Sequence, residues 1–351
     1  MSLPDISSAV DSVRAIQWDQ NQLMLLDQRQ LPARIEFLTL NSVEGVATAI
    51  SDMVVRGAPA IGIAAAYGVV LAAISVYRDY PGDWRQVLIE KIPLLLDSRP
   101  TAVNLRWALE RMRKVIDLSR MDPVATLLQE ANLILNEDIE GNRRMGKIGA
   151  AYLQNSGSVL THCNTGSLAT GGFGTALGVI RTAYASNYLQ MVYAAETRPW
   201  LQGSRLTAWE LKQDGIPVTL VADSAGAWLM QAGKVAWVIV GADRIAANGD
   251  VANKIGTYAH AVNARHHGIG FMVVAPLATI DPETANGEHI EIEQRKPGEL
   301  LEFSGIRIAP EGVSAYNPVF DVTPAELITV LVTERGAVEK PNQEKIRQLL
   351  C

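Results

Sequence analysis

The sequence predicts an α/β protein: a C-terminal Rossmann-like parallel sheet with helices on both faces, and a smaller N-terminal domain of helices with a short antiparallel sheet. After Ser156, short apolar runs alternate with helical segments, which is typical of a parallel sheet covered on both faces. Before that point the apolar spacing is helical from Ser42 to about Leu153, and residues 13–40 alternate. We therefore expect an N-terminal domain over residues 1–145 and a Rossmann-like domain over residues 146–351.

The N-terminal domain is expected to begin with a small antiparallel sheet and to continue in helices. Strands are expected at Gln22–Asp27 and Ala33–Phe37. Helices are expected at Val43–Val55, Ala60–Tyr77, Trp84–Leu95, Val103–Leu118 and Pro123–Leu153. The last segment is long for a single helix, so we expect a break near Gly141 or Gly146 and a role in linking the two domains.

The Rossmann-like domain is expected to alternate strands and helices. Strands are expected at Ser158–His162, Leu189–Ala195, Val218–Ala222, Val235–Val240 and Ile269–Ala275, with helices near 171–185, 203–214, 224–232 and 251–267.

Bulk composition indicates an ordinary soluble enzyme. The chain has 351 residues, of which 48% are hydrophobic and 19% charged, so it can bury a sizeable core. A net charge of -6 argues against a nucleic-acid partner or an anionic membrane surface, although it leaves room for a local basic pocket. The two cysteines, Cys163 and Cys351, are too few for a disulfide framework, which favours a reducing cytoplasm.

The sequence shows no strong signal for secretion or for insertion into a membrane. The segment from Met1 to Gln20 carries acids and lacks an apolar core of signal-peptide length, so secretion is not expected. The uncharged stretch from Gly57 to Tyr77 is long enough to cross a bilayer. It is rich in glycine and alanine and has no second such segment beside it, so we expect a buried core helix and no membrane partner.

The run from Val235 to Val240 delivers Asp243 to the end of a predicted strand. In open α/β sheets, ligands bind outside the carboxyl ends of the strands. A short polar loop follows, and a helical segment is expected to open with Asn253 and Lys254. This stretch therefore places an acid, an amide and a cation where a small ligand would bind.

Two segments of the helical half suggest anion sites. In Arg56-Gly57-Ala58-Pro59, proline favours the first position of a helix whose free N–H groups attract anions, and Arg56 adds a full charge. The alternative is an ordinary helix start with a surface arginine. Arg99 precedes a second helix expected to begin with proline, at Pro100.

Cys163 lies at the end of the first strand of the α/β domain, before a glycine-rich loop. Such loops let backbone N–H groups approach phosphate, and Glu196 ends the next strand as a ribose-binding acid would. The glycine spacing, Gly172-x-Gly174-x-x-x-Gly178, is one residue off the dinucleotide fingerprint. Cys163 taken alone is a packed core thiol or, at a strand end beside a helix start, a reactive one.

A third loop, from Glu196 to Arg205, carries charged and amide groups at a strand end. Arg198, Gln202 and Arg205 could face a ligand, or the loop could be a helix cap with solvated arginines. No paired cysteine or histidine spacing predicts a metal site, and no Gly-x-Ser-x-Gly elbow predicts a serine hydrolase.

Taken together, these segments resemble the methylthioribose-1-phosphate isomerase family, the aldose–ketose isomerases of methionine salvage. The resemblance covers nearly the whole chain. It rests on Arg56–Gly62, Ser98–Leu105, Thr161–Gly166, Glu196–Gly203, Gly241–Ile245 and Asn253–Thr257. The wider family includes the alpha, beta and delta regulatory subunits of the eukaryotic initiation nucleotide-exchange factor and ribose-1,5-bisphosphate isomerase.

The resemblance implies a homodimeric cytoplasmic enzyme that acts on a sugar phosphate with no metal and no other cofactor. By motif match, Asp243 would be the catalytic acid and Cys163 its partner. The substrate and its phosphate would be held by Arg56, Gly57, Ala58, Arg99, Gln202, Asn253 and Lys254.

An aldose 1-phosphate cannot open its ring by the ordinary route, so a general acid must protonate the ring oxygen. A carboxyl can do so at neutral pH only if its pKa is raised, and the apolar run before Asp243 would raise it by desolvation. Three alternatives stay open: a non-enzymatic regulatory subunit, a ribose-1,5-bisphosphate isomerase and an NAD-dependent dehydrogenase. Trp200 and Phe173 favour a methylthio group over a second phosphate.

Overall fold

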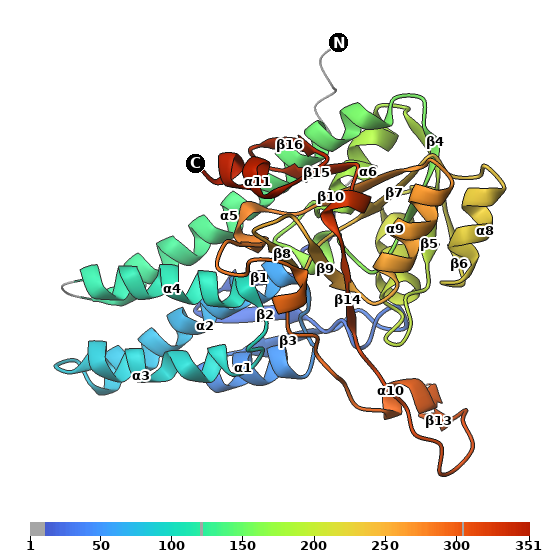
Figure 1. The fold of residues 1–351 in the computed structure, drawn as a ribbon. Helices are drawn as coiled ribbons and strands as arrows, with labels where there is room; N and C mark the ends of the chain where they lie inside the picture. Colours follow the sequence, from blue (N-terminus) through green and yellow to red (C-terminus); the bar gives the residue numbers. More distant parts are fainter. Residues whose placement is uncertain (1–10, 120–121, 304) are drawn as a thin grey trace.

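The computed structural model describes residues 11–119, 122–303 and 305–351. Figure 1 shows a helical part on one side of the molecule and a large sheet with its covering helices on the other. The long helix α5 runs from the helical part toward the sheet.

The helical part begins with a three-stranded antiparallel sheet, as expected. Its strands are β1 (Ile16–Asp19), β2 (Gln22–Leu26) and β3 (Phe37–Leu40), paired in that order. The strand predicted at Ala33–Phe37 was wrong, because the residues before Phe37 are exposed and follow a run of turns. Alternation in that segment therefore did not reflect a buried face.

Five helices follow. They are α1 (Val43–Ser51), α2 (Ala58–Asp79), α3 (Trp84–Leu96), α4 (Val103–Leu118) and α5 (Pro123–Ala150). Helix α2 lies at the centre and contacts the other four. It is apolar and long enough to cross a membrane, but 83% of its apolar window is buried inside the protein, in keeping with the expected core helix. Arg99 does not precede a helix that starts at Pro100, because α4 starts at Val103 after a turn.

The main sheet has seven strands in the order β16-β15-β10-β7-β4-β5-β6. The strands are β4 (Gly157–Thr161), β5 (Leu189–Ala195), β6 (Val218–Val221), β7 (Trp237–Val240), β10 (Gly270–Val274), β15 (Val330–Thr333) and β16 (Gly336–Glu339). All neighbours are parallel except β15 and β16. The chain starts at β4, builds outward to β6, and then returns to the other side of β4 with β7. This is the doubly wound order, and it has a switch point between β4 and β7.

Helices cover both faces of this sheet, as predicted. They are α6 (Ala176–Ala185), α7 (Ala208–Gln213), α8 (Ala225–Gln231), α9 (Thr257–His266) and α11 (Gln343–Leu350). Residues of α5, α6 and α7 pack in one apolar core, and residues of α8, α9 and α11 pack in another. A five-residue π-helical turn, Gly203–Thr207, leads into α7.

A second sheet, with the order β11-β8-β9-β14, lies between the helical part and the main sheet. Its strands are β8 (Arg244–Ala246), β9 (Val251–Lys254), β11 (Ile280–Asp281) and β14 (Phe320–Thr323). Before β14, the short α10 (Gly298–Leu301), β12 (Glu302–Phe303) and β13 (Ile306–Arg307) form the arm that projects from the body in Figure 1.

The second sheet overturns one prediction. Asn253 and Lys254 end strand β9 and do not open a helix, because β9 pairs with the distant β14. Helix α9 begins only at Thr257, after Gly256 in a left-handed conformation with φ of 105°.

Helix α5 is continuous across Gly141 and Gly146, so the predicted break was wrong. It contacts both α2 and α6, and the expected boundary at residues 145 and 146 falls inside it. Gly146 and Gly149 serve close packing against α6, whereas Gly141 does not. A Cβ at Gly149 would lie 2.5 Å from a methyl group of Val179 on α6, whereas a Cβ at Gly141 would meet nothing nearer than 3.5 Å.

This difference gives a matched pair of substitutions. Gly141→Ala should stabilise the protein by about 0.5–1 kcal/mol, because alanine loses less conformational entropy in a helix. Gly149→Ala should destabilise it by about 1–3 kcal/mol, because the new methyl group overpacks the α5–α6 contact. Urea unfolding measures both changes, and equal effects of the two substitutions would contradict the packing assignment.

Candidate active site

A cavity of about 770 Å³, counted with its open mouth, lies at the carboxyl ends of the central strands. A smaller cavity opens beside it and shares Arg56, Cys163 and Asp243. The larger cavity is lined by Arg56, Gly57, Ala58, Arg99, Cys163, Gln202, Asp243 and Lys254, and the smaller one by Asn253. The fold thus brings together the residues to which the family resemblance assigned catalytic or substrate-binding roles.

The switch point of the main sheet positions Cys163 and Asp243. Strands β4 and β7 are parallel neighbours, with Thr161 opposite Ile239, and the two residues follow their respective ends. Loops after these two strands diverge to opposite faces, which leaves a crevice between them. The crevice is where the cavities lie.

The backbone of Cys163 is held in an unusual conformation. Its φ of 63° is in the left-handed region, which costs a residue with a side chain about 1 kcal/mol. Its N–H donates to Oγ1 of Thr197 at 2.9 Å, and its carbonyl accepts from Oγ1 of Thr207 at 2.6 Å. These two bonds fix the loop so that Cys163 lines both cavities.

Asp243 is half-buried at the end of β7. Its N–H donates to the carbonyl of Ala252 at 2.9 Å, which ties the loop to β9. Burial raises the pKa of Asp243, and the nearby charges of Lys254, Arg56 and Arg99 oppose that rise. A carboxyl in this environment keeps its proton to higher pH than an exposed aspartate does.

Lys254 is the buried cation nearest in sequence to this acid. Burial lowers the pKa of its ammonium group to about 8, and the positive charge of Arg295 acts in the same direction. Its Nζ lies 4.3 Å from the ring centroid of Phe320, the residue opposite it on β14. Next to it, the Asn253 Nδ2 donates to Oγ1 of Thr257 at 2.9 Å, which fixes the amide.

Two arginines share one carboxylate at the mouth of the cavity. An Nη of Arg99 lies 3.4 Å from Glu293, and Nε of Arg295 lies 3.2 Å from the same carboxylate. Burial lowers the pKa of Arg99. The motifs did not predict Arg295 or Glu293. They lie between β11 and β14, and no motif or predicted strand end marked this segment as one that returns to the cavity.

The smaller cavity has the character of an anion site. The first turn of α2, with Gly57 and Ala58, lines one side, and Thr175, which precedes α6, lines another. Gly57 has a φ of 97°, and a Cβ there would lie 2.6 Å from Ala169. Thr165, a motif residue for which no role was predicted, also lines this cavity. Within the described part of the chain its buried Oγ1 has no hydrogen-bond partner.

Of the two alternatives for the loop from Glu196 to Arg205, the structure favours a structural role for its arginines. Arg198 donates to the carbonyls of Pro199 and Glu299, and Arg205 donates to those of Trp200, Gln28 and Leu31. These are structural bonds, and neither arginine lines the two cavities. Trp200 and Phe173 lie elsewhere too. The apolar lining of the larger cavity comes from Met53, Ile61, Ala102, Ile290, Ile292 and Phe320.

Gln202 is the member of that loop that does reach the cavity. It is buried, and its Oε1 has no hydrogen-bond partner among the described residues. A buried acceptor or donor without a partner is costly, so such an atom beside a cavity is available to a ligand.

The backbone N–H groups of the glycine-rich loop after Cys163 are already hydrogen-bonded and are not free to bind a pyrophosphate. The N–H groups of Gly171, Gly172 and Phe173 donate to Asp138, Thr170 and Asp11, respectively. Those of Gly174 and Thr175 donate to backbone carbonyls. The protein itself therefore satisfies the donors on which a dinucleotide would depend.

Comparison with known proteins gives consistent matches. The model of the Initiation factor 2 subunit family matches residues 54–340. Methylthioribose-1-phosphate isomerase of Thioalkalivibrio sulfidiphilus is 59% identical over 342 residues, which cover 97% of this chain and 98% of the relative. The enzyme of the same name from Alkalilimnicola ehrlichii is 58% identical over 340 residues, again covering 97% and 98%.

Solved structures match over the same length. A 5-methylthioribose 1-phosphate isomerase from Pyrococcus horikoshii superposes with a TM-score of 0.92 at 44% identity, covering 100% of this chain and 99% of that one. The delta subunit of translation initiation factor eIF-2B from A. fulgidus has a TM-score of 0.84 at 44% identity, covering 96% and 99%. Proteins with these two different names share the fold, so the fold alone does not identify an activity. The activity has to be inferred from the residues of the site.

The lowered pKa of Lys254 can be measured. Its ammonium group should lose its proton near pH 8, where ordinary lysines, with pKa values of about 10.4, stay charged. NMR of isotopically methylated lysines across pH 6–11 should show one resonance with this midpoint, and it should be missing in Lys254→Gln. If every resonance titrates near 10, burial has not shifted the pKa of this group.

Proposed function

The chain belongs to the Initiation factor 2 subunit family, and from this premise we propose that it is a methylthioribose-1-phosphate isomerase. It converts 5-methylthioribose 1-phosphate to 5-methylthioribulose 1-phosphate in methionine salvage. The observation that carries the proposal is the site itself: a half-buried acid with a raised pKa faces a cavity lined by cations and apolar side chains. We further propose a homodimer in the cytoplasm, on the strength of the family resemblance.

The charges around the cavity favour a substrate that carries one phosphate. Arg56, Arg99, Arg295 and Lys254 outnumber the acids that line it, Asp243 and Glu291. Arg56 forms no ion pair within the described residues, so its charge is available to an anion. The free N–H groups in the first turn of α2 would add hydrogen bonds to the phosphate oxygens.

The remaining wall suits a thioether. Met53, Ile61, Ile290 and Ile292 form an apolar surface on the larger cavity, and a methylthio group would be desolvated there at little cost. A second phosphate beside these side chains would lose its hydration at a higher cost than a methylthio group does. The geometry therefore favours the methylthio sugar over ribose 1,5-bisphosphate.

We propose that Asp243 acts as the general acid. Its proton passes to the ring oxygen as the bond from that oxygen to C1 breaks, which opens the ring while the phosphate stays on C1. The hydrogen on C2 then moves to C1, and the C2 hydroxyl becomes the ketone as it loses its proton. A carboxyl that is still protonated at neutral pH can perform the first step, whereas an exposed aspartate could not.

Cys163 lies on the other side of the same crevice, and two routes for the hydrogen involve it differently. In a proton-transfer route, Cys163 removes the proton from C2 and a proton is returned to C1. In a hydride shift, the hydrogen moves directly and Cys163 shapes a dry surrounding for the charged transition state. Substrate deuterated at C2 tests the two routes, because loss of deuterium to water requires proton transfer, whereas full retention supports the hydride shift.

Turnover and one substitution test the proposed function. The purified chain should isomerise 5-methylthioribose 1-phosphate with a kcat/KM at least about a hundredfold above that for ribose 1,5-bisphosphate, because the apolar wall rejects a second phosphate. Asp243→Asn should lower kcat by a factor of about 10³ or more while the substrate Kd changes little, because only the transferable proton is lost.

The alternatives predict other outcomes. A regulatory subunit would turn over neither sugar phosphate, and a ribose-1,5-bisphosphate isomerase would show the reverse preference. An Asp243→Asn variant that keeps its kcat would remove Asp243 from the mechanism and leave the identity of the acid open to the other cavity groups.

A further inference from the structure

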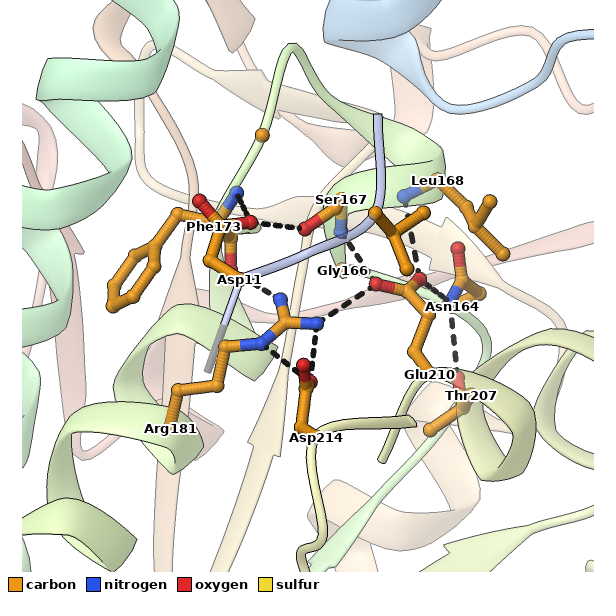
Figure 2. Close-up of polar contacts among 12 residues, drawn as sticks. Asp11, Asn164, Gly166, Ser167, Leu168, Phe173, Arg181, Thr207, Glu210 and Asp214 are labelled. Carbon is orange, nitrogen blue, oxygen red and sulfur yellow. Dashed lines mark hydrogen bonds and ion pairs between the residues drawn. The ribbon is translucent and has the colours of Figure 1, made fainter. Parts of the chain in front are cut away.

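A network of buried polar residues lies behind the substrate cavity. Its members, named here the Arg56 network, are Arg56, Asn164, Glu210 and Arg181. Figure 2 shows the inner part of this network, where Glu210 lies between Asn164 and Arg181. All four side chains are buried, with exposed fractions of 9% for Arg56, 1% for Asn164, and 0% for Glu210 and Arg181.

The first step joins Arg56 to Asn164. One Nη of Arg56 donates to Oδ1 of Asn164 at 2.7 Å, and the other donates to its backbone carbonyl at 2.9 Å. These two bonds fix the plane of the guanidinium group. The partner is a neutral amide, so Arg56 keeps its full positive charge, whereas a carboxylate in the same place would cancel that charge and compete with a substrate phosphate.

The second step fixes which way Asn164 faces. The amide of an asparagine side chain has an oxygen that accepts and a nitrogen that donates. Its orientation can flip by 180° unless the hydrogen-bonding groups around it favour one orientation. The Nδ2 of Asn164 donates to Oε1 of Glu210 at 2.8 Å. Because a carboxylate can only accept, Glu210 requires the amide nitrogen to face it, and Oδ1 must then face Arg56.

The third step holds Glu210. Its Oε2 accepts from the N–H of Ser167 at 2.7 Å and from Arg181 at 3.0 Å, and Arg181 also donates to Asp214 at 2.8 Å. Figure 2 shows Arg181 directed at both acids. The charge of Glu210 is therefore balanced on the side away from the cavity, and breaking a buried pair of this kind is strongly destabilising.

We propose that Glu210 is a positioning residue for the isomerase site: it orients the amide of Asn164, which in turn holds Arg56 as an unneutralised cation for the substrate phosphate. The inference rests on the proposed function for its substrate. Glu210 comes from α7, Asn164 from the loop after β4, and Arg56 from the segment before α2. The network thus ties the helical part of the molecule to the sheet at the point where the substrate binds.

A double-mutant cycle on Glu210→Gln and Arg56→Ala tests the proposal. Glutamine has the shape of glutamate but can donate as well as accept, so it no longer dictates the orientation of Asn164. Glu210→Gln should raise the KM for 5-methylthioribose 1-phosphate and the Kd for inorganic phosphate about tenfold, with kcat changed by less than about threefold, as expected for one lost charge-assisted hydrogen bond. In the Arg56→Ala background, the same substitution should change either quantity by less than about twofold.

Effects that multiply in the double variant would overturn the proposal, because Glu210 would then act on stability or on another group. Asp214→Asn is the matched control. It removes a partner of the same Arg181. The Asp214 side chain has no hydrogen bond to Glu210, Asn164 or Arg56 among the described residues, and its backbone bond to the Glu210 carbonyl survives the substitution, so the variant should have a lower Tm and a KM within about twofold. A tenfold rise in KM for this control would also contradict a specific path.

Two further arms cover other outcomes. If Glu210→Gln does not fold, Asn164→Ala replaces it in the cycle, because it removes the link from Glu210 to Arg56 and leaves the Glu210–Arg181 pair intact. The phosphate titration separates this inference from the proposed function. If the two substitutions are coupled in the phosphate Kd but the unmutated chain turns over no substrate, the positioning role of Glu210 is supported and the proposed isomerase activity is refuted. If the unmutated chain turns over its substrate but the substitutions are not coupled, the activity is supported and the positioning role is refuted.

Discussion

The active site depends on the adjacency of β4 and β7 in the main sheet. Because the chain leaves β4 toward one edge and returns beside it as β7, the loops after these two strands part and open a crevice. Cys163 and Asp243 are the residues that this geometry puts on its two sides. Burial at this position raises the pKa of Asp243, although the cations around the cavity oppose the rise. A thiol and a carboxyl with a raised pKa thus face one small space because of strand order.

Positive charge is the second requirement of the site, and the fold maintains it in different ways. Arg99 and Arg295 both pair with Glu293, and Arg295 also lies 3.8 Å from Glu299. Lys254 lies over an aromatic ring, and Arg56 is held by a neutral amide. The last two arrangements position a cation without an ion pair. The cations are therefore fixed before a substrate arrives, so little reorganisation is needed when a phosphate binds.

Sequence patterns identified the parts of the molecule that local rules control. Helix α4 and strand β5 have the bounds that their apolar periodicity predicted, and the strand-end loops brought Asp243, Cys163 and Gln202 to one cavity. Asn253 and Lys254 line the cavities, but they lie on a strand where the sequence predicted the start of a helix. The strand, β9, forms by pairing with the remote β14, which local periodicity does not indicate. Arg295 was missed for a related reason: its position depends on how the chain returns to β14. Gly141 and Gly146 indicated a break in α5 by propensity, but the helix is continuous, and Gly146 serves close contact with α6, which only the packed structure reveals.

We propose that Asp243 carries a proton at neutral pH before substrate binds, as its role as the general acid requires, and infrared difference spectroscopy tests this claim. The spectrum of the unmutated protein minus that of Asp243→Asn at neutral pH isolates this one carboxyl from the other acids. We predict the carbonyl band of a protonated carboxyl at neutral pH. This band should disappear when the pH is raised, because a carboxyl with a raised pKa loses its proton at higher pH than an ordinary aspartate. A carboxylate band in its place at neutral pH would show that Asp243 is ionised before substrate binds and would contradict the claim.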